Sequence, residues 1–165
     1  MTKAGSQCEV PTTHVDIYPT FCELGGAALP EKQVLDGESL VPLFKDGSAS
    51  LKRASIFQHF PGYLGAGGGT WRTTPVATVI TGDWKLMEFM EDQHLELYNL
   101  RADIGERNNL AATQVEKAKA MQTALHTWQS SVGAKFPTKN DSIKAAEPEK
   151  KAKGKGKGKK AKSAK

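Results

Sequence analysis

The sequence predicts an α+β fold: a four-stranded antiparallel sheet packed by a long C-terminal helix and preceded by a helix–loop segment. Three observations lead to this fold class. Short Val-, Ile- and aromatic-rich runs are separated by turn signals. An amphipathic stretch follows them and carries one apolar stripe. The first 53 residues are rich in Pro, Gly and Asp, which favour turns over strands.

The N-terminal segment is expected to be a short helix followed by loops. Residues 16–24 predict the helix, with Asp16 as N-cap and Gly25 as a left-handed stop. Its apolar side chains fall on one face: Ile17, Phe21 and Leu24. Prolines and Asp-Gly pairs in residues 27–53 indicate loops around one helical turn near residues 39–44.

The central segment is expected to form a β-meander. The expected strands lie at residues 55–60, 75–80, 84–89 and 95–100. A turn at Thr81-Gly82-Asp83 and the short spacing of the runs suggest an antiparallel meander. Residues 61–70 contain five glycines and are expected to be a flexible loop. They lack the Lys-Ser/Thr pair of a phosphate-binding loop, so they do not predict a nucleotide site.

The last predicted element is a helix at residues 113–132. Its start, Thr113-Gln114-Val115-Glu116, fits a capping box, and Gly133 is expected to end it. Its apolar residues are three or four positions apart: Val115, Ala118, Met121, Leu125, Trp128 and Val132. Such a stripe has to be buried, and the meander is the sizeable partner that the sequence offers.

The net charge of +5 is unevenly distributed along the chain. Residues 141–165 contain ten lysines and three acidic residues, whereas residues 1–140 contain 13 basic and 15 acidic residues. The Lys-rich tail lacks apolar residues that could offset chain entropy, so we expect it to be disordered. One function it allows is weak, non-specific polyanion binding, which would be salt-sensitive because no aromatic residues are interleaved.

Several classes of protein are excluded or unsupported. No apolar run approaches the ~18 residues of a membrane span, and the N-terminus lacks the apolar region of a secretory signal. Two cysteines without CxxC spacing do not predict a disulfide framework or a metal site. No HExxH or GxSxG motif occurs. The carboxylates of Glu88, Glu91 and Asp92 are expected to be solvated, and His126 to be an ordinary helix residue.

The residues themselves therefore indicate no catalytic residue and no metal ligand set. The strongest binding candidates are His59 at a strand end, Tyr63 beside it, and Arg72 at the far end of the glycine loop. Loops at strand ends often carry binding groups, and these three side chains could recognise an anion through charge-assisted hydrogen bonds. The alternative is a strand-edge histidine and a surface arginine.

An ordered series of short motifs resembles the type I sulfatases of the arylsulfatase A kind. The series covers about residues 5–140 and matches the C-terminal third of such enzymes. Its main members are Val15-Asp16-Ile17-Tyr18-Pro19-Thr20, Asp36-Gly37-Glu38-Ser39-Leu40-Val41-Pro42-Leu43-Phe44, His59-Phe60-Pro61-Gly62-Tyr63, Gly82-Asp83-Trp84-Lys85-Leu86, Glu96-Leu97-Tyr98-Asn99-Leu100 and Asn109-Leu110-Ala111.

The resemblance implies sulfuric ester hydrolysis, with a formylglycine nucleophile made in a C/S-x-P-x-R motif and a calcium ion that binds the sulfate. It implies that the loop of His59 borders the substrate pocket, and that Lys85 is a strand residue of the C-terminal subdomain with a structural or surface role. It also implies a periplasmic or secreted full-length enzyme. The chain departs from the family because neither Cys8 nor Cys22, nor any serine, fits C/S-x-P-x-R.

This departure predicts an inactive sulfatase fragment, whose nucleophile and calcium ligands would belong to an α/β domain before Met1. Residues 1–53 would be the end of that catalytic domain with connecting loops, residues 54–140 the C-terminal subdomain, and residues 141–165 the tail. A sulfated substrate would then be bound only together with the missing domain. The alternatives are a polyanion-binding protein that acts through its tail and a structural remnant without function.

Overall fold

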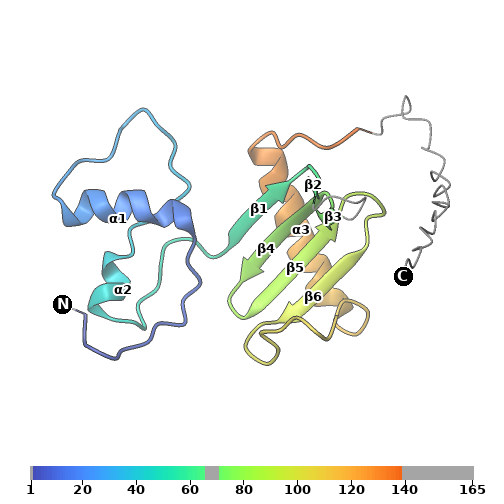
Figure 1. Ribbon diagram of the computed structural model, residues 1–165, viewed down its shortest axis with the longest axis horizontal. Helices are drawn as coiled ribbons and strands as arrows, with labels where there is room; N and C mark the ends of the chain where they lie inside the picture. The colour runs from blue at the N-terminus through green and yellow to red at the C-terminus, as the bar shows by residue number, and fades with distance from the viewer. Residues whose placement is uncertain (1, 66–70, 139–165) are drawn as a thin grey trace, which may run out of the picture.

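The computed structural model describes residues 2–65 and 71–138 (Figure 1). A 3-10 turn, η1 (His14–Asp16), precedes the helices α1 (Ile17–Leu24) and α2 (Val41–Lys45). The strands follow as β1 (Ile56–Phe60), β2 (Leu64–Gly65), β3 (Trp71–Thr73), β4 (Val76–Thr81), β5 (Trp84–Phe89) and β6 (Leu95–Asn99), and α3 (Val115–Ser131) comes last. The expected disorder of the 141–165 tail lies outside the described residues.

The predicted fold class is confirmed. The main sheet has the strand order β1-β4-β5-β6, and every neighbouring pair is antiparallel. Strands β4 and β5 are joined by the two residues Gly82 and Asp83, with Thr81 opposite Trp84. Gly82 has a φ of +54°, a conformation that glycine adopts without a steric penalty.

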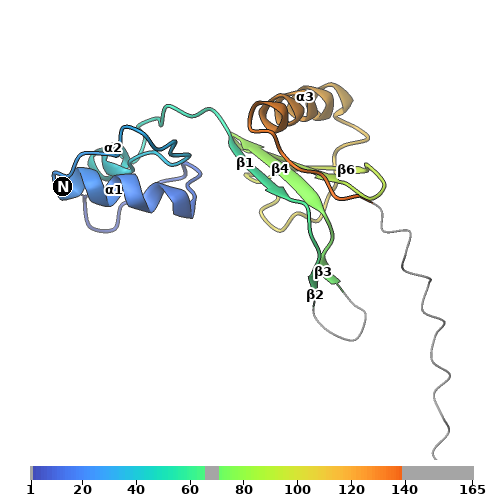
Figure 2. The ribbon, with the colours of Figure 1, turned by 90° about the horizontal axis from the view of Figure 1, so that it is seen from above.

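Helix α3 covers one face of the sheet, as Figure 2 shows. The core between them consists of Ala77, Val79, Leu86, Leu97, Ala118, Met121 and Leu125. Phe57 of β1 stacks on Trp128 of α3 with ring centroids 5.0 Å apart. The predicted stripe therefore packs on the meander, although its ends at Val115 and Val132 are about half exposed.

Two of the predicted helix ends are wrong in detail. The residue before α3 is Gln114, and no side chain caps the helix; the Thr113 hydroxyl instead donates to the Leu110 carbonyl. After α1, Gly25 keeps a right-handed conformation, and Gly26 has the positive φ of +67°. Gly133, with a φ of +62°, ends α3 as expected.

The glycine-rich segment is more ordered at its ends than the sequence predicts. Strands β2 and β3 pair antiparallel, with Leu64 opposite Thr73. They continue the β1–β4 pair beyond the main sheet, and Figure 2 shows this two-stranded hairpin projecting away from the layer beneath α3. The remaining loop residues, 66–70, are outside the described residues.

A buried ion pair joins the N-terminal helices to the chain that enters the sheet. Asp16 is fully buried, and Arg53 contacts both of its carboxylate oxygens. The same carboxylate accepts hydrogen bonds from the backbone N–H groups of Thr13 (2.8 Å) and Glu38 (3.0 Å). Close approach at this joint explains the Asp36-Gly37 pair, because a Cβ on Gly37 would lie 2.0 Å from the Val15 carbonyl oxygen.

Helix α1 leaves its apolar face uncovered. Ile17, Phe21 and Leu24 are 50%, 68% and 60% exposed, respectively. The helix is thus held from its first turn, by the Asp16 joint and by the Thr20 hydroxyl, which accepts from the Leu40 N–H at 2.9 Å.

Candidate functional site

The three binding residues expected from the sequence lie along one ribbon of the structure. His59 is in β1, opposite Ala77 of β4, Tyr63 immediately precedes β2, and Arg72 is in β3. The ribbon runs from the sheet into the projecting hairpin (Figure 2). Among the described residues no hydrogen bond joins any two of the three side chains, so they share a ribbon but do not form a bonded cluster.

His59 is held by groups of its own chain. Its Nε2 lies 2.8 Å from the backbone oxygen of Lys135, and a carbonyl oxygen only accepts, so Nε2 carries the proton. The Gln129 amide nitrogen lies 3.2 Å from Nδ1, and because an amide N–H only donates, Nδ1 is the acceptor in this contact. Phe136 packs edge-on against the imidazole, with centroids 5.2 Å apart. His59 therefore anchors the segment after α3 to the sheet.

Tyr63 and Arg72 differ in their surroundings. The Tyr63 hydroxyl donates to Glu91 at 2.5 Å, and this hydrogen bond, together with partial desolvation and the negative charge of Glu91, raises the pKa of Tyr63. The Arg72 side chain is exposed, and no hydrogen bond or ion pair reaches it from the described part of the chain. Its guanidinium is available to an anion that approaches the hairpin.

A second polar cluster, which sequence reasoning missed, lies between β5 and α3. Glu88 is 9% exposed, so the expectation of a solvated carboxylate is wrong for this residue. Its Oε1 accepts from Gln122 at 2.8 Å, and its Oε2 lies 2.6 Å from Nε2 of His126. The strand alternation could have revealed it, because Glu88 shares parity with Leu86 and Trp84 on the face that α3 covers.

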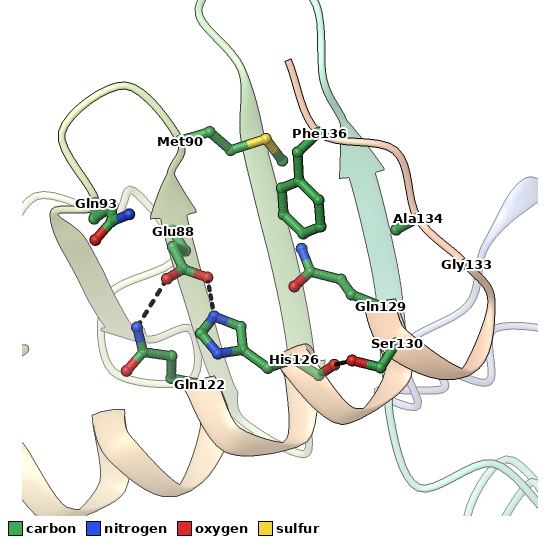
Figure 3. Close-up of a pocket in the computed structure, with 10 residues that line it drawn as sticks. All are labelled: Glu88, Met90, Gln93, Gln122, His126, Gln129, Ser130, Gly133, Ala134 and Phe136. Atoms are coloured by element: carbon green, nitrogen blue, oxygen red, sulfur yellow. Dashed lines mark hydrogen bonds and ion pairs between the residues drawn. The ribbon is translucent and has the colours of Figure 1, made fainter. Parts of the chain in front are cut away.

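The Glu88 cluster opens onto a surface hollow of about 590 Å³ (Figure 3). Its walls come from β5, the turn after it, the C-terminal half of α3 and the segment that His59 anchors. Figure 3 shows Glu88, His126 and Gln129 facing a common space, with Met90 and Phe136 above them. Gln122, His126 and Gln129 follow helical spacing beside the apolar stripe, a signal that sequence reasoning did not use.

Lys85 has a structural partner. Its ammonium lies 2.9 Å and 2.8 Å from the two carboxylate oxygens of Glu106, in the loop after β6. Both side chains are partly buried, which holds this loop against the outer face of the sheet. The contact agrees with the structural role expected for Lys85.

The described residues do not fit the calcium ion that the sequence resemblance implies. Within residues 2–65 and 71–138, no three His, Cys, Asp or Glu side chains gather as a metal site would require. In the same ranges, no helix combines the length and the apolar character needed to cross a membrane.

Comparison with known proteins finds a matching family model and several relatives that are named as sulfatases. The family model described as N-sulphoglucosamine sulphohydrolase, C-terminal, matches residues 1–131. A sulfatase of Formosa agariphila is 32% identical over 127 residues, which are 69% of this chain and 22% of that protein. Human steryl-sulfatase is 38% identical over 64 residues, covering 39% of this chain and 11% of that protein.

A solved structure shows the same arrangement. The structure of BT4656 in complex with its substrate, D-glucosamine-2-N,6-O-disulfate, aligns with a TM-score of 0.62 and 26% identity. The alignment covers 78% of this chain and 26% of that one. The chain thus spans about a quarter or less of the length of these relatives.

Proposed function

Because the chain belongs to the N-sulphoglucosamine sulphohydrolase C-terminal family, we propose that it acts as the C-terminal subdomain of an arylsulfatase-like sulfuric ester hydrolase. The observation that supports this most is the family match over residues 1–131, which includes both the sheet and the N-terminal helices. In this proposal the subdomain supplies packing and substrate contacts, and the reaction chemistry comes from a sulfatase catalytic region.

The division of labour follows from what a sulfate ester requires. Hydrolysis needs a nucleophile in line with the leaving oxygen and fixed positive groups around the sulfate. The 165 residues contain no C/S-x-P-x-R motif, and the described residues hold no metal ligand cluster. We therefore propose that formylglycine and calcium act in the catalytic region, and that this chain alone is inactive.

This proposal assigns the substrate contacts to the ribbon that the β1–β4 pair and the β2–β3 hairpin form together. Arg72 supplies an exposed cation, and Tyr63 a hydroxyl already polarised by Glu91. His59 supports them from the base of the ribbon, where Gln129 and Lys135 hold its ring. A sulfated substrate bound by the catalytic region would meet the hairpin through Arg72, whose planar guanidinium suits sulfate oxygens.

A chimera tests the proposal. Residues 1–138 would replace the matching portion of the Formosa agariphila sulfatase, with the formylglycine-generating enzyme co-expressed, and turnover of that relative's substrate would be measured. We expect activity in the chimera and none in the 165-residue chain. In the chimera, Arg72→Ala should change KM more than Lys85→Ala, because Lys85 is engaged by Glu106.

Two outcomes contradict the proposal. Sulfatase turnover by the 165-residue chain, abolished by Cys8→Ala or Cys22→Ala, would place the nucleophile in this chain. A folded chimera in which Lys85→Ala abolishes turnover and Arg72→Ala has no effect would remove the ribbon as the substrate-contacting element.

The basic tail supports a second candidate function, polyanion binding. Ten lysines in residues 141–165 would release counterions from an anionic polymer, so binding would weaken steeply with salt. Heparin-column retention of the chain with and without residues 141–165 tests it. Equal retention of the two forms would rule out the tail as the binding element.

A further inference from the structure

The projecting β2–β3 hairpin has a short ladder of its own (Figure 2). In the described part of the chain, β2 and β3 pair at two positions, Leu64 with Thr73 and Gly65 with Trp71, and the register shifts between them. A two-stranded ladder of this length is marginal by itself. The direction in which the hairpin presents Arg72 therefore depends on contacts with the rest of the sheet.

The turn that joins β5 to β6 supplies such contacts on both sides of the hairpin base. The Met90 N–H donates to the carbonyl of Pro75, a fully buried residue between β3 and β4, at 2.9 Å. The next residue, Glu91, accepts a hydrogen bond from the Tyr63 hydroxyl, just before β2, at 2.5 Å. Two consecutive residues of one turn thus hold both chains of the hairpin where it leaves the sheet.

This turn is itself fixed in an uncommon conformation. Gln93 has a φ of +60°, which non-glycine residues rarely adopt, and its N–H donates to the Phe89 carbonyl at 2.8 Å. The His94 ring stacks on Phe89 with centroids 4.2 Å apart, and its Nδ1 lies 2.5 Å from the Asp92 carboxylate. Backbone strain of this kind persists where neighbouring contacts hold it, so the turn is a firm support for the hairpin.

The contact between Glu91 and Tyr63 also separates two roles on the ribbon. A phenol has a single proton, and that of Tyr63 is donated to Glu91. The exposed guanidinium of Arg72 supplies the N–H donors that an anion requires. Glu91 is negatively charged and does not suit a sulfate, so its place beside the hairpin is explained by the hydrogen bond to Tyr63.

We propose that Glu91 is a positioning residue, which acts through Tyr63 to fix the direction of the β2–β3 hairpin and hence the place at which Arg72 meets a substrate. The effect on substrate rests on the proposed function, because it requires a catalytic region beside the hairpin. The effect on the hairpin does not, so the two can be measured separately.

Backbone ¹⁵N relaxation of the 165-residue chain measures the effect on the hairpin. Glu91→Ala and Tyr63→Phe each remove the hydrogen bond, so we expect the order parameters of the β2 and β3 amides to fall from about 0.85 toward 0.6. Those of β1 and β4, which pair in the main sheet, should not change. Glu91→Gln keeps an acceptor oxygen and should restore most of the order. Both positions are exposed, so the variants should fold.

Tyr98→Phe is the matched control. The Tyr98 hydroxyl also donates to a glutamate, Glu96, at 3.0 Å, but both residues lie in β6. Its loss should leave the order of β2 and β3 unchanged. An equal loss of hairpin order in Tyr98→Phe, or unchanged order in both Glu91→Ala and Tyr63→Phe, would overturn the proposal.

Kinetics of the chimera with the Formosa agariphila sulfatase measure the effect on substrate. Glu91→Ala should raise KM at least about threefold and change kcat by less than about twofold, whereas Glu91→Gln should stay close to the unaltered chimera. Adding Arg72→Ala to Glu91→Ala should raise KM by less than Arg72→Ala does alone, because the two act through one contact. An unchanged KM with a loosened hairpin would overturn the positioning role. A folded chimera without turnover would count against the proposed function, and the relaxation data would still decide whether Glu91 holds the hairpin.

Discussion

At the scale of single residues, the Asp16–Arg53 pair is the clearest determinant of stability. Asp16 has no exposed surface, and the Arg53 side chain is 15% exposed. Arg53→Met would leave the carboxylate buried without its counter-charge, so we expect a loss of about 3–5 kcal/mol in the free energy of unfolding. Urea denaturation measures this loss.

Arg101→Met is the matched control for Arg53. The Arg101 side chain is 67% exposed and pairs with Glu9 and Asp83 at the surface. Exposed pairs of this kind contribute about 0–1 kcal/mol. Equal losses in the two variants would show that the buried joint is not the stabilising feature that its geometry indicates.

The same carboxylate predicts how stability changes with pH. Burial raises the pKa of Asp16, but hydrogen bonds from Arg53, Thr13 and Glu38 and the charge of Arg53 outweigh it and hold the pKa below its usual value. A depressed folded pKa stabilises the protein above the unfolded value of about 3.9, and the contribution is lost as the pH falls through the folded pKa.

Asp16→Asn should therefore be less stable than the unaltered chain at about pH 5, and its stability should fall less on acidification to about pH 3. Urea unfolding at both pH values measures the difference. Asp46, Asp92 and Asp103 also have lowered pKa values and remain in the variant, so part of the acid dependence should persist. An unchanged acid dependence would mean that Asp16 is not its source.

At the scale of elements, α3 and the sheet could be predicted because their signals are periodic. Apolar residues at helical spacing identified the face of α3 that contains Leu125, and short β-type runs separated by turn signals identified the meander. The strands β2 and β3 were not predicted. They pair because they continue the β1–β4 pair, and the glycine-rich composition of this segment gives no local sign of that pairing.

The candidate sites were less predictable because they depend on contacts between distant residues. Glu88 meets Gln122 and His126 across 34 and 38 positions, and Gln129 meets His59 across 70. Local patterns placed His59 at a strand end but could not show that Lys135 would occupy its Nε2. Burial of Glu88 was accessible from strand parity alone, whereas its partners required the packed helix.

Leu125 tests the helix–sheet contact directly. It is fully buried in the core, so Leu125→Ala should cost about 2–5 kcal/mol through lost apolar burial and the cavity left behind. Val115→Ala, on the same stripe but 56% exposed, should change stability by less than about 0.5 kcal/mol. Chemical unfolding compares the two; a small loss at Leu125 would contradict the packing of α3 on the sheet.

At the scale of the whole molecule, apolar side chains are buried between the sheet and α3 but exposed on α1. The sheet and α3 enclose a continuous core, whereas α1 presents its apolar face to solvent. Contiguous exposed apolar surface commonly marks a place where another surface docks. In relatives that are several times longer than this chain, such a face has further protein available to cover it.

The exposed face of α1 should therefore bind a hydrophobic dye and limit solubility. Phe21→Gln combined with Leu24→Gln removes two of its largest exposed side chains, so dye fluorescence should fall and solubility should rise. Stability should change by less than about 1 kcal/mol, because neither side chain is in the core and glutamine is a good helix former. Val34→Gln is the control: Val34 is 91% exposed but lies outside α1, so its loss should leave the dye signal unchanged. If the folded double variant binds as much dye as the unaltered chain, the dye-binding apolar surface lies elsewhere on the molecule.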